Sequence, residues 1–169
     1  YSVSKNTTLG VVLNGFYNPS LWESNSSTFI KNPDGSLNQQ IISETYNDEK
    51  WKNFSSNINF RTKLDTAGQE LTADLDFIQY KATSFQPLTS TYYNNIGNIT
   101  DGPDVLNGTL PTNIKIFSGK VDYTLPLKKD AKFEAGFKTS FVNTDNNARY
   151  DSLKSGYNVL DSGRSNHFI

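Results

Sequence analysis

The chain has 169 residues, of which 35% are hydrophobic, and it carries 16 basic and 17 acidic side chains. This length suits a single domain, residues 1–169, and the near-neutral charge with scattered Lys and Arg indicates no nucleic-acid partner. Because the chain has no Cys and one His, His167, disulfides, thiolate catalysis and clustered Cys or His metal ligands are excluded.

Five segments alternate between apolar and polar residues with a period of two, which is typical of β-strands that have one dry and one wet face. In the clearest of them Phe54, Ile58 and Phe60 point to one side, and Asn57 and Arg61 point to the other. No apolar run approaches the roughly 20 residues that a membrane helix needs, whereas a barrel strand needs only about 9 to 11 alternating residues. The predicted strands lie near residues 7–17, 51–64, 70–82, 113–125 and 132–143.

The connections between these strands are of two kinds. Short turns at 65–69 and 126–131 alternate with long polar segments near 18–50, 83–112 and 144–166. Outer-membrane barrels show this asymmetry, with tight periplasmic turns and longer extracellular loops. We therefore predict an all-β fold, an antiparallel meander of about five to seven strands that is a fragment of a large outer-membrane β-barrel, with the three long segments as extracellular loops. The first of these segments is expected to form a hairpin above the membrane, with residues 28–30 and 37–46 on either side of a turn at 32–35.

Aromatic and charged residues support opposite environments for the two rows. The apolar row has aromatic residues at its ends, where an interfacial girdle belongs: Tyr17, Phe54, Phe117, Phe141, Tyr123 and Phe133. The polar rows are expected to face an aqueous lumen, and their charged members are Arg61, Lys63, Asp74, Asp76, Lys120, Asp122 and Lys138. Across the first hairpin we expect Arg61 to lie opposite Asp74.

The sequence contains no motif that indicates catalysis. Asp74 and Asp76 stand two residues apart, as an acid and base pair might, but such pairs need a defined pocket, and solvated lumen charges explain them better. The acidic stretch 145–151 lacks the ligand spacing of a calcium loop. We predict no catalytic residues, no metal site, no cofactor and no enzymatic activity.

One long segment is the best candidate for contact with a ligand. Its aromatic and amide side chains suit sugars or other polar organic molecules, although solvated connectors often have the same composition. The candidate ligand-binding residues are Tyr92, Tyr93, Asn94, Asn95, Asp101 and Asp104.

Two stretches, residues 51–80 and 120–151, resemble the barrel of TonB-dependent outer-membrane receptors in the form common among Bacteroidetes. The resemblance rests on the patterns K-L-D-x-x-G-x-E-L-x-x-D-L-D and D-Y-T-x-P-L-K-K-x-x-K-F-E-A-G-x-K. It implies a bacterial outer-membrane location and uptake of a scarce ligand such as a siderophore, cobalamin, a glycan or a peptide. The implied partners are outer-membrane lipid, the remaining strands and plug of the parent receptor, and the TonB motor, which acts through an N-terminal part absent here.

Two alternatives remain open. A secreted β-sandwich adhesin or glycan-binding module would also have strands with one apolar face, which a second sheet would cover. A passive porin would share the barrel but lack a plug. Because five strands are too few to close a membrane barrel, for which about eight is the minimum, we expect the chain to be part of a larger barrel.

Overall fold

The computed structural model describes residues 1–128 and 131–169, and this part of the chain is all-β with eight antiparallel strands in one sheet. This confirms the predicted fold class, and two of the eight strands are only three or four residues long. Lys129 and Asp130 of the predicted turn at 126–131 lie outside the described residues. The strands are β1 (Thr7–Lys31), β2 (Leu37–Lys63), β3 (Glu70–Asn94), β4 (Ile99–Thr109), β5 (Thr112–Pro126), β6 (Lys132–Lys154), β7 (Tyr157–Leu160) and β8 (Asn166–Phe168).

The chain divides into two compact units, and four long strands contribute segments to both. Unit 1 comprises Tyr1–Phe16, Lys52–Lys81 and Asn113–Thr144. Unit 2 comprises Tyr17–Trp51, Ala82–Thr112 and Asp145–Ile169. Among the described residues no helix is long and apolar enough to cross a membrane.

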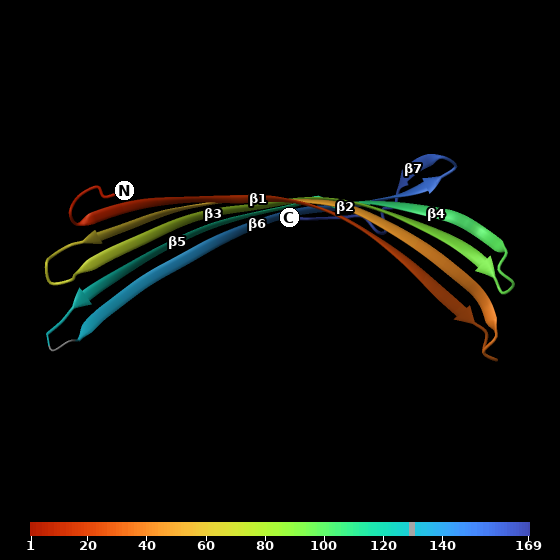
Figure 1. The fold of residues 1–169 in the computed structure, drawn as a ribbon, viewed down its shortest axis with the longest axis horizontal. Helices are drawn as coiled ribbons and strands as arrows, with labels where there is room; N and C mark the ends of the chain where they lie inside the picture. The colour runs from red at the N-terminus through yellow and green to blue at the C-terminus, as the bar shows by residue number, and fades with distance from the viewer. Residues whose placement is uncertain (129–130) are drawn as a thin grey trace. The chain divides into compact units, whose positions relative to one another are not determined.

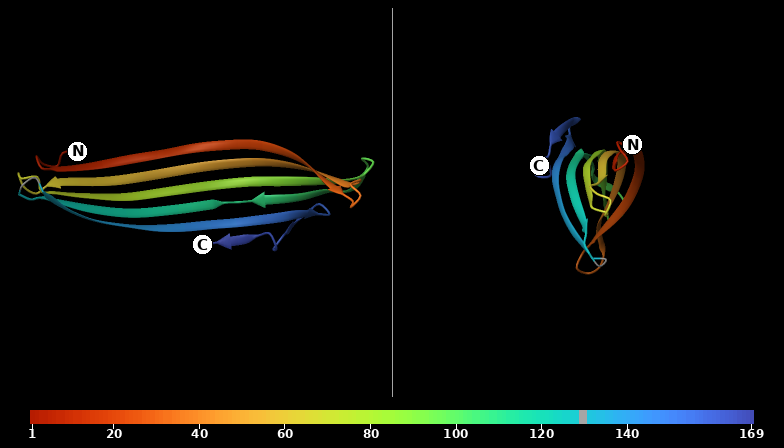
Figure 2. Two further views of the ribbon diagram at one scale, coloured as in Figure 1. Left: turned by 90° about the horizontal axis from the view of Figure 1, so that it is seen from below. Right: turned by 90° about the vertical axis from the view of Figure 1, so that its left-hand side faces the viewer.

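In unit 1 the neighbouring strand segments follow the order β1, β2, β3, β5 and β6 (Figures 1 and 2). The hairpin between β2 and β3 closes where the Leu64 N–H donates to the Gln69 carbonyl at 2.8 Å. The Asp65 carboxylate accepts the N–H groups of Ala67 and Gln69, and Gly68 adopts a φ of 99° that few other residues tolerate. The turn predicted at 65–69 is therefore confirmed.

Unit 1 is one layer of sheet with no interior of its own. Every described side chain of β6 between Lys132 and Asn143 is exposed, on the apolar row as well as on the polar row. The buried residues of the described chain all lie in unit 2: Asn47, Ala82, Ser84, Gly108 and Asp151. The alternation in unit 1 therefore does not reflect burial within this chain.

Unit 2 consists mainly of strands. The hairpin predicted within 18–50 is confirmed, with its turn between Lys31 and Leu37, whereas strands replace the loops predicted over most of 83–112 and 144–166. The turns are short: Asn32 and Ser36 close the first, and Asn94 and Asn98 close the second. The strands here carry polar residues on both faces, and so they show no alternation. The extracellular location of these segments stays a prediction.

The strands of unit 2 are paired over most of their length. β3 and β4 pair from Phe85 opposite Thr109 to Ser90 opposite Asp104, and the register shifts beyond Ser90. β6 pairs with β4, β7 and β8. The pairing places Ser90 and Asp104, which are far from each other in sequence, directly opposite one another.

Candidate functional site

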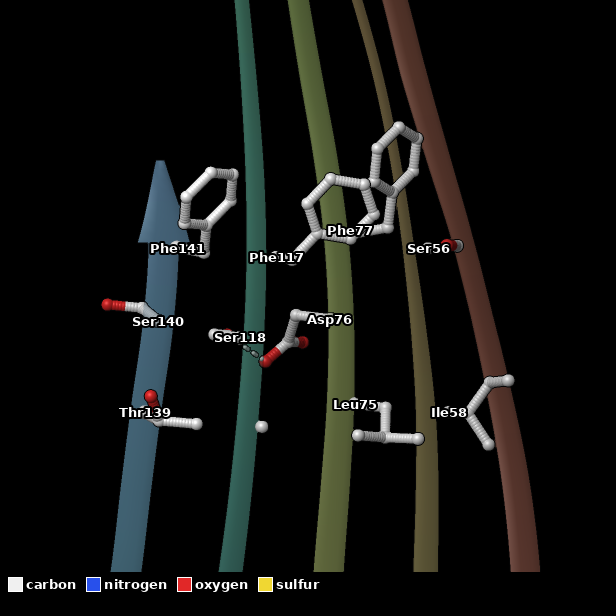
Figure 3. A pocket seen from close by; sticks show the side chains of 11 residues that line it. Ser56, Ile58, Leu75, Asp76, Phe77, Phe117, Ser118, Thr139, Ser140 and Phe141 are labelled. Carbon is white, nitrogen blue, oxygen red and sulfur yellow. Dashed lines mark hydrogen bonds between the residues drawn. The ribbon is translucent and has the colours of Figure 1, made fainter. Parts of the chain in front are cut away.

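Unit 1 presents a continuous apolar face that corresponds to the predicted apolar rows. The rings of Phe54, Phe77 and Phe117 meet across three neighbouring strands, with centroids 6.3 Å apart in the first pair and 4.9 Å apart in the second. Phe141 of β6 lies at the same level (Figure 3). The Leu75 side chain is 62% exposed, so the described residues leave this face largely uncovered.

A shallow apolar depression of about 490 Å³ lies next to this aromatic row. Three small residues form the floor of the depression: Ser56, Gly119 and Thr139. Larger residues flank each of them along the same face of its strand. Leu75 and Ile58 form the wall away from the rings (Figure 3). A Cβ added at Gly119 would meet only Leu75 Cδ2, at 3.4 Å, so the space above this glycine is open.

Beyond the aromatic row the same face becomes polar. Lys52 lies two residues from Phe54 on β2, and Lys115 lies two residues from Phe117 on β5. Between them, the Gln79 amide donates to Asn113 Oδ1 at 2.9 Å. A band of apolar side chains that ends in aromatic rings and then in polar groups is the pattern of a strand that leaves a bilayer.

The opposite face of unit 1 carries a chain of polar contacts. Asn59 Nδ2 donates to Asn57 Oδ1 at 3.0 Å, and Asn57 Nδ2 donates to Asp76 Oδ1 at 2.7 Å. Ser118 Oγ donates to Asp76 Oδ2 at 2.9 Å (Figure 3). The Asn59 amide lies over Gly10, where an added Cβ would stand 2.3 Å from Asn59 Oδ1. Asp76, predicted as a lumen charge, is thus the shared acceptor of a network that reaches from β2 to β5.

The expected pairing of Arg61 with Asp74 is wrong. Arg61 Nη2 lies 2.7 Å from Glu70 Oε2 instead. The hairpin closes at Leu64 and Gln69, which makes the loop shorter than we expected. Each residue of β2 therefore faces a residue of β3 that is earlier in the sequence than the expected partner. Arg61 is 60% exposed, so this ion pair contributes at most about 1 kcal/mol to stability.

The other predicted lumen charges occupy the same polar face by strand alternation. Lys120 Nζ and Asp122 Oδ2 form an ion pair at 2.5 Å. The Asp122 carboxylate lies over Gly136, where a Cβ would clash with Asp122 Oδ1 at 2.3 Å. Three further members of this row form no ion pair with another described residue: Lys63, Asp74 and Lys138.

The six candidate ligand residues lie on β3, β4 and the turn between them, and most of them do not converge. Asn94 Oδ1 accepts the N–H groups of Ile96 and Asn98, so it stabilises the turn. Asp101 Oδ1 accepts the N–H of Gly102. Asn95 is exposed in the turn, and Tyr93 pairs with Ile99 at the end of the ladder.

Tyr92 and Asp104 do come together, in a polar cleft of about 360 Å³ within unit 2. A hydrogen bond to Asp104 raises the pKa of Tyr92, because the bond favours the protonated phenol. Lys154, Asp161 and Arg164 line the same cleft, and none of the three is among the residues predicted from the sequence. Only the turn-forming stretch 161–163 (Asp-Ser-Gly) could have pointed to this region.

The acidic part of the cleft is fixed by its own turn. Arg164 Nη1 lies 2.6 Å from Asp161 Oδ2, and Asp161 Oδ1 accepts the N–H groups of Gly163 and Arg164. These contacts hold the pKa of Asp161 below its usual value, chiefly through Arg164. The cleft therefore offers an aromatic ring, a lysine, an arginine and two carboxyl groups to a polar ligand.

The described residues form no arrangement that favours metal binding. Within residues 1–128 and 131–169, no three His, Asp or Glu side chains gather as a metal site requires. His167 Nε2 lies 2.7 Å from Asp145 Oδ1, and both side chains are about half exposed to solvent.

Unit 1 combines an uncovered apolar face, aromatic rings at its border and a hydrogen-bonded polar face, which together define the wall of a membrane-spanning β-barrel. Residues 62–169 match the model of the outer membrane protein beta-barrel family. The match covers more than half of the chain, which therefore belongs to that family and is a protein of the bacterial outer membrane, in contact with membrane lipid. A search of curated proteins found no match. The outer-membrane location argues against a secreted sandwich module.

Proposed function

We propose that the chain forms part of the barrel wall of a TonB-dependent receptor, which takes up a scarce ligand such as a siderophore, cobalamin, a glycan or a peptide. Two observations support this proposal: membership of the outer-membrane barrel family and the resemblance of residues 51–80 and 120–151 to such receptors. The chain contributes binding and passage, with no catalytic step.

The length of the strands is the observation that carries the proposal furthest. β1, β2 and β3 have 25, 27 and 25 residues, whereas a barrel strand crosses the membrane in about 9 to 11. The surplus residues belong to unit 2, where β4 adds to the sheet. A passive pore does not need so long a wall, whereas a receptor that captures ligand from dilute solution gains binding surface from it.

The cleft of unit 2 fits the capture step. The Tyr92 ring offers an apolar surface to a sugar or another ring, and Asp104 and Arg164 offer an acceptor and donors around it. In the proposed receptor the ligand passes on to a plug that the TonB motor displaces. The wall described here stays in place while the plug moves.

Energy dependence tests the proposal. Cells that display the full-length protein are incubated with a labelled ferric siderophore, cobalamin, oligosaccharide or peptide, with and without an uncoupler that collapses the proton gradient. A receptor retains surface binding of its ligand but loses uptake when the uncoupler is added. Uptake that continues at the same rate, without saturation, identifies a porin and refutes the proposal.

A variant pair tests the role of the cleft. Tyr92→Ala removes the ring from the cleft and should lower ligand affinity about two- to tenfold, since an aromatic contact is worth roughly 0.5 to 1.5 kcal/mol. Tyr157→Ala is the matched control, because Tyr157 lies on β7, is 76% exposed and does not line the cleft. Equal losses in both variants would remove the cleft from the binding site.

A further inference from the structure

We propose that the cleft of unit 2 binds an acidic saccharide, whose carboxylate or phosphate group lies between Lys154 and Arg164 while a sugar ring lies on the apolar floor beside Tyr92. This assignment deepens the proposed function and rests on it in one respect, because it takes the cleft as the site where the receptor captures its ligand. It does not depend on the TonB motor, since it concerns binding alone.

The floor of the cleft is largely apolar and lies on three neighbouring strands. Leu88 of β3 lies opposite Leu106 of β4, and Leu106 lies opposite Ser152 of β6. All three residues line the cleft, and its volume of about 360 Å³ is within the range of small-ligand sites. The two leucine side chains and the Tyr92 ring therefore offer an apolar surface to the C–H face of a sugar, and Ser152 offers a hydroxyl group.

The two carboxyl groups of the cleft already have donors within the protein. Asp104 accepts the hydrogen bond of the Tyr92 hydroxyl. Asp161 Oδ2 lies 2.6 Å from Arg164 Nη1, and Asp161 Oδ1 accepts the N–H groups of Gly163 and Arg164. Because internal donors satisfy both carboxylates, neither of them requires a cationic ligand.

The two cations, by contrast, retain donors for a ligand. Lys154 lines the cleft and forms no ion pair with another residue of the described chain. Arg164 uses Nη1 for Asp161, so the edge of its guanidinium group formed by Nε and Nη2 has no partner among the described residues. This edge carries two parallel N–H donors, which match two oxygens of a carboxylate or phosphate group.

The backbone on either side of Arg164 is held against β6, the strand that carries Lys154. The Asp161 N–H donates to the Tyr150 carbonyl at 2.8 Å, and the Tyr150 N–H donates to Ser165 Oγ at 2.9 Å. Because this segment is already ordered, less conformational freedom is lost when the two cations contact one anionic group.

The test measures binding of saccharides to the full-length protein in uncharged detergent by titration calorimetry. The acidic probes are oligosaccharides of galacturonic, glucuronic and mannuronic acid, together with phosphorylated mannose oligosaccharides. Each is compared with a neutral counterpart, in which the carboxyl groups are reduced to alcohols or the phosphates are removed, so the two sets distinguish a carboxylate ligand from a phosphate ligand.

Two variants remove the donors that the site requires. Lys154→Gln removes one cation, and Arg164→Lys keeps the charge but removes the two-donor edge of the guanidinium group. The matched controls are Lys31→Gln and Arg149→Lys, because Lys31 and Arg149 are exposed residues of unit 2 that do not line the cleft. Heat-modifiable gel mobility verifies that each variant folds.

We expect the wild type to bind at least one acidic saccharide more tightly than its neutral counterpart. Lys154→Gln should lower the affinity for that acidic saccharide about threefold to fivefold, since an exposed ion pair seldom contributes more. Arg164→Lys should lower it about tenfold through the loss of a charge-assisted hydrogen bond, and both controls should match the wild type.

The proposal is overturned if no acidic saccharide binds the wild type more tightly than its neutral counterpart, or if Lys154→Gln weakens the binding of both members of a pair equally. Energy-dependent uptake is measured separately in cells. A protein that takes up only neutral ligands in an energy-dependent manner would refute the acidic saccharide and leave the receptor function intact. Acid-selective binding without energy-dependent uptake would refute the receptor and support the acidic-saccharide site.

Discussion

The substitution Leu75→Arg distinguishes a lipid face from a water-exposed face. Leu75 lies on β3 in the middle of the apolar band, one level from Phe77 on the aromatic row. Its side chain is 62% exposed, so the chain itself provides little packing that the substitution could disrupt. The cost of the substitution therefore reports the medium that surrounds the face.

The expected cost of Leu75→Arg in free energy of unfolding differs by several kcal/mol between a face that meets water and a face that meets lipid. If the face meets water, replacing an exposed leucine with arginine changes the free energy of unfolding by about 0.5 kcal/mol or less. If the face meets lipid near the bilayer midplane, arginine costs about 2 to 4 kcal/mol. The latter range lowers the equilibrium constant for folding by a factor of roughly 30 to 1,000.

Urea titration of the full-length protein in phosphatidylcholine vesicles measures this cost. Thr72→Arg is the control, because Thr72 lies on the polar row of the same strand, three residues away. We expect Leu75→Arg to lower the free energy of unfolding by at least 2 kcal/mol more than Thr72→Arg does. Equal costs for the two variants would refute the assignment of the apolar face to lipid.

Three further predictions concern single groups. Asp76→Ala leaves two donors without their acceptor and should lower stability to urea by about 1 to 2 kcal/mol; an unchanged midpoint would show that the polar network is unimportant. Because its contacts lower the pKa of Asp161, the carboxylate contributes to stability fully above about pH 4 and loses this contribution as the pH falls through the lowered pKa. Amide protection in residues 161–165 should therefore fall as the pH is lowered below about 4 in the wild type, but not in Asp161→Asn. Gly102→Ala should lower stability by at least about 1 to 2 kcal/mol in thermal unfolding, because Gly102 has a φ of 90° and its added Cβ would stand 2.7 Å from the Ser90 carbonyl oxygen. Gly163→Ala, whose Cβ would meet only one atom at 3.5 Å, should change it little, and equal losses would contradict this reasoning.

The membrane-spanning part of the fold could be predicted because each face of unit 1 meets one medium. Alternation from Phe133 to Phe141 predicts β6 correctly, although no other part of the described chain covers those side chains. The turn at Gly68 could also be predicted from the sequence, because Asp65 supplies the side-chain acceptor and Gly68 the positive φ that the turn requires.

Apart from the hairpin around the turn at 32–35, the strands of unit 2 could not be predicted in the same way. Between Tyr17 and Ser27, β1 mixes polar and apolar residues without alternation, so the sequence resembles that of a polar loop. Backbone pairing stabilises such strands without leaving a pattern in the side chains. The cleft depends on this pairing: Tyr92 and Arg164 are 72 positions apart, and only the ladders of β3, β4 and β6 bring them together.

Cysteine scanning along β6 tests the central claim most directly, since the chain has no cysteine of its own. Single cysteines at positions 133–142 of the full-length protein are exposed to a polar, membrane-impermeant maleimide in intact outer membranes and again after solubilisation and unfolding. All these side chains are exposed in the structure, so a water-surrounded sheet would react at every position. If one face meets lipid and the other meets water, cysteines at odd positions such as Phe137 are protected from the maleimide in the membrane. Cysteines at even positions such as Lys138 react with it. Uniform labelling of both rows in the membrane would contradict the account.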